Sequence, residues 1–260
     1  MAPNRTDSPF PARASASVAV VGGGRLGAAL AGALRGSGHK VAGPLGRDER
    51  PRGYEAVLLC VPDAEIAAAA AAVRGSAPLV GHTSGATSLD ALAAAGGTAF
   101  GLHPLQTFAG GEGPEHFRGA GCAVAGQTPA AVEFASAMAR RLGMQPFAIA
   151  DADRAAYHAA ASIASNFLLA LQATAEEVAG GAGLERSEAR ELLAPLVRST
   201  VENWAAHGPE RALTGPVARG DEVTVERQRE AVAQVAPGSL PLFDALVART
   251  RALAGREALL

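Results

Sequence analysis

This chain of 260 residues has few cysteines, little net charge and few long apolar runs. The two cysteines, Cys60 and Cys122, lie in separate apolar segments and belong to no C-x-x-C or His/Cys cluster, which favours buried thiols over a disulfide or a metal site. A reducing cytoplasm fits such thiols. The formal net charge of −2 argues against nucleic acid or an anionic membrane as a partner, because phosphate groups are bound by concentrated Lys and Arg.

Neither a signal peptide nor a membrane span is predicted. Residues 1–15 are rich in Pro, Ser and Arg and lack an apolar core segment, so we expect a disordered tail. Residues 18–34 are apolar, but glycines and Arg25 interrupt them and the segment is short for a span. A hydrophobic content of 48% with 18% charged residues instead indicates a globular chain with a packed core.

The most informative segment reads as a buried strand, a glycine turn and the start of a helix. Its glycines have the G-x-G-x-x-G spacing of a dinucleotide-binding turn. The first glycine permits a tight turn, the second a close approach of the backbone to a pyrophosphate, and the third close packing of helix on strand. The helix N-terminus offers free N–H groups to phosphates. The alternative is a tight strand-to-helix turn without a ligand. The candidate cofactor-binding residues here are Gly22, Gly24, Arg25, Leu26 and Gly27.

Strand and helix signals alternate in the N-terminal half, which predicts a parallel sheet covered on both faces. The link between residues 45 and 56 is too short for a helix with two loops, so we expect an abbreviated crossover there. Strands are expected over 18–21, 40–45, 56–61, 79–83, 99–103, 122–125 and 146–149, and helices over 25–35, 63–73, 88–95 and 129–142.

Beyond residue 150 strand signals disappear, and helices are expected over 154–179, 187–206, 223–235 and 240–253. The predicted fold is therefore an α/β Rossmann-like parallel sheet followed by an all-α C-terminal domain. Its parts are a tail (1–15), a dinucleotide-binding domain (16–150) and a helical domain (151–260) for substrate binding and dimerisation. We expect a homodimer because these helices are apolar on more than one face.

Arginine follows the second strand, where NAD-binding folds usually carry Asp or Glu. Arg47 is the first polar residue after that strand, and Arg50 and Arg52 lie close behind it. A guanidinium suits the 2′-phosphate of NADP, because it bonds phosphate oxygens bidentately. The alternative is a solvated loop, since Asp48 and Glu49 nearly balance the charge.

Three further loops are expected at the carboxyl edge of the sheet, where open α/β folds bind ligands. They carry Val61 and Pro62, Ser84, and His103 as candidates for cofactor binding or catalysis. The alternatives are structural. Ser84 precedes a glycine as in many turns, Ser88 can cap the helix that follows, and His103 precedes a proline.

The first helix of the C-terminal half carries His158, Ser162 and Asn166 at i, i+4 and i+8, one polar stripe on an apolar helix. Buried polar groups need partners, so we interpret the stripe as substrate-binding, with His158 or His103 as an acid or base. A hydrogen-bond network between helices or plain exposure is the alternative. Tyr157 points about 100° away from the stripe and is expected in the core.

A glycine-bearing loop later in the chain carries Arg219, which is a candidate clamp for a substrate carboxylate or phosphate. Asp221 is expected to cap the next helix instead. No nucleophile elbow is present, because Ser84 lacks the G-x-S-x-G frame of α/β-hydrolases.

These motifs, in this order, resemble a family of Rossmann-like proteins whose C-terminal helical domain is known only as a domain of unknown function. The layout is similar to pyrroline-5-carboxylate reductase, ketopantoate reductase and the β-hydroxyacid dehydrogenases, with a 6-phosphogluconate-dehydrogenase-like C-terminal domain. The resemblance implies an NADP-dependent oxidoreductase that transfers a hydride between NADPH and a small carbonyl or imine held between two domains. It is carried by the glycine turn, Val61-Pro-Asp63, His82-Thr-Ser-Gly85, His103-Pro-Leu, Tyr157-His-Ala-Ala, Asn166, and Thr214-Gly-Pro with Arg219-Gly-Asp221.

One departure from the related dehydrogenases concerns the proton donor. They carry a catalytic Lys one turn before a substrate-binding Asn; Asn166 matches the Asn, but Ser162 stands at the Lys position. Gln228 stands where this family is expected to have a His. Either His158 or His103 therefore supplies the proton, or the chain is a non-catalytic NADP-binding sensor or assembly module.

Overall fold

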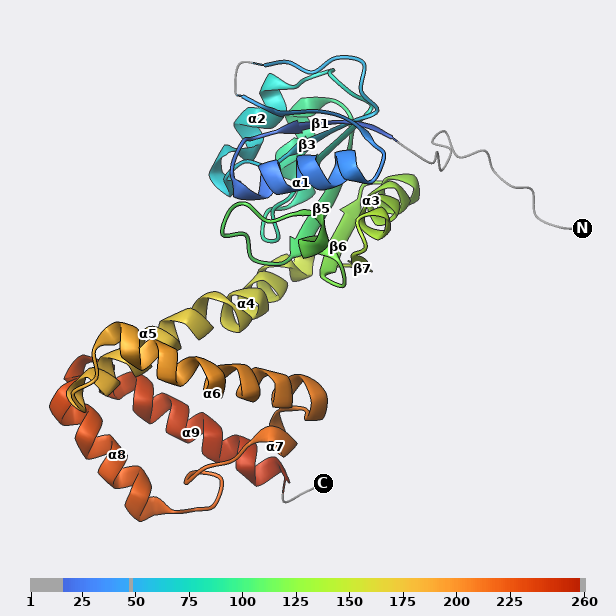
Figure 1. The fold of residues 1–260 in the computed structure, drawn as a ribbon. Coiled ribbons are helices and arrows are strands. Elements are labelled where there is room, and N and C mark those ends of the chain that lie inside the picture. Colours follow the sequence, from blue (N-terminus) through green and yellow to red (C-terminus); the bar gives the residue numbers. More distant parts are fainter. Residues whose placement is uncertain (1–15, 47–48, 258–260) are drawn as a thin grey trace, which may run out of the picture. The chain divides into compact units, whose positions relative to one another are not determined.

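The structure is a computed structural model that describes residues 16–46 and 49–257. The predicted tail (1–15) and Arg47 lie outside the described residues. The chain forms two compact units, unit 1 (Met1–Ser165) and unit 2 (Asn166–Leu260), shown in Figure 1. We expected a boundary after residue 150. The compact unit extends further because helix α4 (Arg154–Ala164) is bonded through its first residue to the loops of the sheet.

Unit 1 is built on a seven-stranded sheet, in which every predicted strand is confirmed (Figure 1). The spatial order is β2-β1-β3-β4-β5-β6-β7, so the order reverses beside β1. Such a reversal is where open α/β sheets bind ligands. In chain order the strands are β1 (Ser17–Val21), β2 (Lys40–Leu45), β3 (Ala56–Leu59), β4 (Leu79–His82), β5 (Thr98–Leu105), β6 (Gly121–Gly126) and β7 (Gln145–Ala148).

The expectation of a wholly parallel sheet is wrong at one edge. The pairs among strands β1 to β5 are all parallel, but β6 is antiparallel to β5 and parallel to β7. The link from β5 to β6 contains only the short 3-10 helix η3 (Pro114–Phe117). A parallel connection usually passes through a full helix that covers a face of the sheet. This link has no such helix, and the chain returns in the opposite direction.

Alternate residues of the central strands face two separate hydrophobic clusters. Val18 and Val20 pack with α1 (Arg25–Gly36), α3 (Pro129–Arg141) and η3 on one face. Ala19 and Val21 pack on the other face with α2 (Ile66–Ala72) and η2 (Leu89–Ala95). The sheet is therefore covered on both sides, as its continuously apolar strands predict.

The short helices of unit 1 differ in type from the prediction. The segment expected as an α-helix over 63–73 begins as a 3-10 helix, η1 (Asp63–Glu65), before α2. η2 is also a 3-10 helix, and Ser88 caps it by accepting a hydrogen bond from the Asp90 N–H at 3.2 Å, as predicted. A further short helix, η4 (Asp151–Asp153), precedes α4. Between β2 and β3 the described residues 46 and 49–55 contain no helix, in agreement with the expected abbreviated crossover.

The helix predicted over 154–179 is two helices, α4 and α5 (Asn166–Gly181), separated at Ser165. Ser165 has φ −119° and ψ −74°, well away from the ideal helix. Neither Gly nor Pro marks this break, so the helical periodicity of the sequence runs across it. The expected stripe is thus divided, because His158 and Ser162 lie on α4 of unit 1 and Asn166 begins α5 of unit 2.

Unit 2 is entirely helical, as expected. After α5 it contains α6 (Arg186–His207), α7 (Pro209–Ala212), α8 (Glu222–Val235), η5 (Pro237–Ser239) and α9 (Leu240–Glu257). Over the described part of the chain, every helix is too short or too polar to cross a membrane. The same residues include no group of His, Cys, Asp and Glu arranged to hold a metal ion.

Candidate functional site

The glycine turn has the geometry that its sequence predicts. Gly22 has φ +107°, and a Cβ there would lie 2.2 Å from the Cys60 carbonyl oxygen. A Cβ at Gly27 would lie 2.0 Å from the Gly22 carbonyl oxygen. Both positions therefore require glycine, one for its backbone angle and both for close packing.

Gly24 differs from these two glycines, because among the described residues no atom beyond its own neighbours in the chain lies within 4 Å of where its Cβ would be. It is the N-cap of α1 and has no side chain with which to cap the helix. The N–H groups of the first helical turn have no acceptor within the helix. Gly24 thus leaves open space in front of free amides, and this arrangement suits a phosphate group.

Val61 and Pro62 come shortly after β3, and Val61 lies beside this turn. A Cβ on Gly22 would approach the Val61 Cγ1 to 3.2 Å. Arg25, the first residue of α1, is exposed, and its aliphatic chain lies 3.7 Å from where a Gly110 Cβ would be. Leu26 is partly buried against the α1 side of the core.

Ser84 uses its hydroxyl within the loop that follows β4. Its Oγ lies 2.8 Å from the Asp63 Oδ2 and 2.9 Å from the Thr87 Oγ1, and it accepts hydrogen bonds from the N–H groups of Ala86 and Thr87. These contacts support the turn that we weighed as the structural alternative for Ser84. They tie the loop after β4 to η1.

His82, at the end of β4, is fully buried. Its Nδ1 accepts a hydrogen bond from the Ser84 N–H at 3.2 Å, so Nε2 carries the proton of the neutral ring. Nε2 faces the Ser88 backbone but forms no hydrogen bond of normal geometry with the described residues. Burial, reinforced by the charge of Arg154, lowers the pKa of His82 to about 4.

Arg154 is a buried cation beneath these loops, with only 3% of its surface exposed. Its Nε donates to the Asp151 Oδ1 at 2.5 Å, and its Nη1 donates to the Ser84 carbonyl at 3.4 Å. Gly101 in β5 makes room for it, because a Cβ there would lie 3.0 Å from Nη2. The first residue of α4 is thereby held against β5 and the loop after β4.

One turn further along α4, two aromatic side chains meet His103 of β5. The Tyr157 hydroxyl lies 2.7 Å from the His103 Nδ1, and the His103 and His158 ring centroids are 6.2 Å apart. Gly85 allows this approach, since a Cβ there would lie 2.8 Å from the His103 Cε1 and 2.9 Å from the His158 Cδ2. His103, Tyr157 and His158 thus form one cluster, which we call the His–Tyr cluster.

The environment of the His–Tyr cluster favours neutral side chains. Burial, together with the neighbouring His158, lowers the pKa of His103 to about 4. Burial raises the pKa of Tyr157 to about 12. At neutral pH the imidazole of His103 is therefore uncharged and the phenol keeps its proton.

The remaining predicted site residues that the structure describes form no hydrogen bond with this cluster and differ in exposure. Ser162 is partly buried on α4, whereas Asn166 is exposed at the start of unit 2. Arg219 is exposed in a turn of unit 2. Asp221 caps α8, as expected, by accepting from the Thr224 N–H at 3.1 Å.

Sequence reasoning placed Tyr157 in the core and did not single out Arg154. Tyr157 is half-buried and bonded to His103, a residue 54 positions away. Its position directly before His158 was the available signal. For Arg154 the signal was an arginine at a helix start next to two aspartates, a pattern that is common on protein surfaces.

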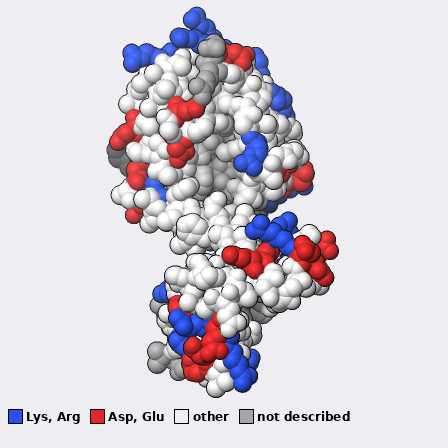
Figure 2. Space-filling model, turned by 90° about the vertical axis from the view of Figure 1, so that its left-hand side faces the viewer, with Lys and Arg blue, Asp and Glu red and all other residues white. Residues whose placement is uncertain are grey.

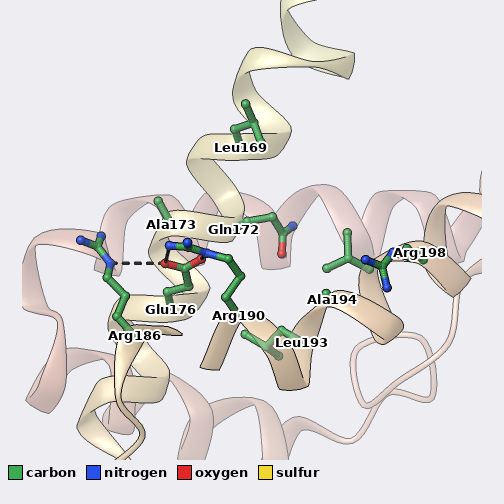
Figure 3. Close-up of a pocket in the computed structure, with 10 residues that line it drawn as sticks. Leu169, Gln172, Ala173, Glu176, Arg186, Arg190, Leu193, Ala194 and Arg198 are labelled. Carbon is green, nitrogen blue, oxygen red and sulfur yellow. Dashed lines mark hydrogen bonds and ion pairs between the residues drawn. The ribbon is translucent and has the colours of Figure 1, made fainter. Parts of the chain in front are cut away.

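Unit 2 contains a groove of about 480 Å³ between α5 and α6 (Figure 3). Glu176 is buried in it and accepts hydrogen bonds from the Arg190 Nε and Nη2 at 2.7 and 2.9 Å, with the Arg186 Nε at 3.3 Å. The hydrogen bonds from Arg190 hold the pKa of this carboxyl below its usual value. None of the predicted site residues that the structure describes lines this groove. Its lining is formed by Leu169, Gln172, Ala173, Glu176, Arg186, Arg190, Leu193, Ala194, Val197 and Arg198.

The surface charges of unit 2 are mixed in sign. On the face shown in Figure 2, acidic and basic side chains of this unit lie next to one another. Bridges such as Arg229 to Asp244 at 2.8 Å pair them. The described residues on this face therefore form no expanse of positive charge of the kind that attracts a polyanion.

Comparison with solved structures confirms the fold. The protein TM1727 of Thermotoga maritima is 25% identical, with a TM-score of 0.74, over 93% of this chain and 99% of that chain. BF3122 of Bacteroides fragilis, provisionally assigned as an NADP oxidoreductase, is 19% identical, with a TM-score of 0.75, over 91% and 98%. Plasmodium falciparum pyrroline carboxylate reductase, solved with NADP bound, is 12% identical, with a TM-score of 0.59, over 92% and 98%.

Comparison with curated protein sequences finds no match. Among protein families, residues 120–250, half of the chain, match the domain of unknown function DUF2520. This agrees with the resemblance found in the sequence motifs. The chain therefore belongs to the DUF2520 family and combines a Rossmann-like N-terminal unit with a helical C-terminal unit.

Proposed function

We propose that this protein is an NADP-dependent oxidoreductase. The observation that carries the proposal is the glycine turn, in which Gly22 and Gly27 are sterically required and Gly24 leaves open space before free helix amides. Solved structures that share the fold include an NADP-bound reductase and a reductive aminase with NADPH. The two unpaired thiols, Cys60 and Cys122, extend the proposal to a reducing cytoplasm.

The cofactor fits the residues at this edge of the sheet. The α1 amides would hold its pyrophosphate, while Val61 and Pro62 would border it on the β3 side. Arg25 is exposed at the start of α1, within reach of an anion there. When bound, NADPH supplies a hydride.

The preference for NADP over NAD rests on Arg47, which lies outside the described residues. We expect Arg47→Asp to weaken NADP binding at least tenfold and to leave NAD binding unchanged, because the guanidinium would bond only the 2′-phosphate. Isothermal titration calorimetry with both cofactors measures this. Arg140→Asp on α3 is the matched control, and unchanged NADP affinity in Arg47→Asp would refute the assignment.

The proposed reaction transfers the hydride to a small carbonyl or imine. His103, His158 and Ser162 remain our candidates for orienting or protonating it, and Asn166 and Arg219 are proposed to bind the substrate. A ligand beside the His–Tyr cluster would meet the neutral imidazole of His103 and the phenol of Tyr157 at neutral pH.

A second candidate function, a non-catalytic NADP-binding module, is favoured by Ser162 standing where related dehydrogenases carry Lys. NADPH oxidation measured against 2-keto acids, cyclic imines and flavin-type acceptors separates the two. Turnover supports the enzyme, whereas tight NADP binding with background oxidation across the panel supports the module.

We further propose a homodimer formed through unit 2. Its helices leave large apolar side chains exposed, among them Leu192, Leu196 and Trp204 on α6. These three residues are spaced by four and eight positions, so they share one helix face. Apolar area of this kind on a soluble chain usually marks an interface.

A further inference from the structure

The Tyr157 phenol is a positioned proton donor of the His–Tyr cluster. It is half-buried, its oxygen lies 2.7 Å from the His103 Nδ1, and its ring packs edge-on against Phe147 at 5.9 Å. The phenol is thus held on two sides while part of the side chain still reaches solvent.

We propose that Tyr157 protonates the oxygen of a neutral ketone or aldehyde substrate, and that the site selects carbonyls against iminium ions. This inference rests on the proposed oxidoreductase function. It replaces the missing Lys of the related dehydrogenases with a phenol from the same helix and narrows the substrate class to carbonyls.

The hydrogen bond between Tyr157 and His103 is arranged for this role if His103 carries its proton on Nδ1. Nδ1–H then donates to the phenolic oxygen and leaves the phenolic hydrogen free for a substrate. The same N–H stabilises the tyrosinate as it forms, because a hydrogen bond to the charged form favours it. His103 itself is a poor acid here, since its pKa of about 4 leaves it uncharged at neutral pH.

The step balances in atoms and electrons. The carbonyl carbon accepts the hydride that NADPH supplies, the π pair moves to the oxygen, and the Tyr157 O–H bond breaks as its proton joins that oxygen. The products are an alcohol, NADP⁺ and a tyrosinate, and water then returns a proton to the tyrosinate. An alkoxide is a stronger base than a tyrosinate, so the transfer runs toward the alcohol.

Charges of both signs surround the cluster. Arg154 is a buried positive charge one turn from Tyr157, and its partner Asp151 is partly exposed, with 40% of its side chain accessible. Asp63 is the carboxylate whose charge opposes the lowering of the His103 pKa, and its Oδ2 lies 2.8 Å from the Ser84 Oγ. His82 and His158 also face His103, and burial keeps His82 neutral.

An iminium ion is already protonated on nitrogen, so its reduction gains nothing from the phenolic proton of Tyr157. A ketone is uncharged until it is reduced, and the negative charge that then develops on oxygen is attracted by Arg154. Cys122 also contributes to the raised pKa of Tyr157. Burial raises the pKa of the Cys122 thiol itself to about 12, so this thiol is neutral at pH 7. The site thus matches a neutral substrate that becomes anionic.

The first test needs neither cofactor nor turnover. Nitrogen-15 NMR of the six histidine side chains at pH 7, with His103 assigned from a His103→Gln variant, reports which nitrogen carries the proton. We expect the Nδ1–H tautomer, shifting toward Nε2–H in Tyr157→Phe. Tyr54→Phe is the matched control, because Tyr54 is the only other tyrosine in the sequence. A wild-type Nε2–H tautomer overturns the inference, since the phenolic hydrogen would then be committed to His103.

The second test compares a cyclic ketone with a cyclic imine of the same ring size, using the full chain and NADPH. We expect the ketone to be preferred at least tenfold in kcat/KM, and Tyr157→Phe to lower its kcat about 10²–10⁴-fold with little change in KM. Preference for the imine, or a Tyr157→Phe enzyme as active as Tyr54→Phe, overturns this inference and leaves the oxidoreductase function standing. Turnover of neither compound overturns both.

Discussion

At the scale of single residues, Gly85 determines whether His103 and His158 can approach one another. The Cβ of an alanine there would lie under 3.0 Å from both imidazoles. We expect Gly85→Ala to cost about 1–3 kcal/mol of unfolding free energy, because the rings must shift in a packed site. Gly32→Ala is the matched control, since Gly32 is exposed on α1 with open space around it. That change should stabilise the protein by about 0.5–1 kcal/mol in urea unfolding.

Two residues also couple stability to pH. The pKa values of His82 and His103 lie near 4 in the folded chain, below the ordinary value of 6.5. Between these pH values the unfolded chain binds protons that the folded chain does not. The free energy of unfolding should therefore be highest above pH 6.5 and should fall as the pH drops toward 4, by up to about 3 kcal/mol per histidine.

Urea unfolding as a function of pH measures this loss. The slope of the unfolding free energy against pH should decrease in His103→Gln, because this variant lacks one of these two histidines. His207→Gln, at an exposed position ending α6, should leave the slope unchanged. An equal slope in all three proteins would show that the buried histidines are not its source.

At the scale of elements, the strand–turn–helix unit of β1 and α1 contains one glycine that packing requires and another that we expect to serve ligand binding. Gly22→Ala places a Cβ against the Cys60 carbonyl at a positive φ, so it should cost at least about 2 kcal/mol of stability. Gly24→Ala is tolerated by the fold, because Gly24 has φ −65° and open space. Its methyl group would occupy the approach to the helix amides, so NADP affinity should fall about tenfold, or about 1.4 kcal/mol.

Thermal unfolding and calorimetry with NADP distinguish the two variants. The expected pattern is a destabilised Gly22→Ala protein and a stable Gly24→Ala protein that binds NADP weakly. Full NADP affinity in a folded Gly24→Ala protein would place the cofactor somewhere else.

At the scale of the whole molecule, unit 2 buries few apolar side chains of its own. Among its described residues only four hydrophobic ones are buried, namely Ala189, Val225, Val232 and Ala236. By contrast Leu196 and Trp204 expose 62% and 56% of their surface. A helical unit with so small a core is expected to gain stability from a second surface.

We therefore expect the wild-type chain to be a dimer and Leu196→Glu to shift it toward monomer, because a carboxylate on the apolar face of α6 would be buried without a partner. Size-exclusion chromatography with light scattering measures the mass. Glu188→Lys, also exposed on α6, is the control and should remain dimeric. A monomeric wild-type chain would refute the dimer.

The sequence predicted the local features of the fold well. All seven strands, the glycine turn and the caps at Ser88 and Asp221 were foreseen. Each depends on neighbouring residues alone: apolar runs on strands, glycine spacing at the turn, and a short polar side chain at a helix start. The helical character of the C-terminal half followed for the same reason.

Packing between distant segments set the rest. Tyr157 meets His103 across 54 residues, and Arg154 reaches the Ser84 carbonyl across 70. Hydrophobic periodicity also did not predict the antiparallel direction of β6 or the division of one predicted helix at Ser165. Periodicity reports which face of an element is buried, but partners are chosen by contacts whose energy depends on three-dimensional packing. The pairing of a phenol with an imidazole over a buried arginine is a result of that packing.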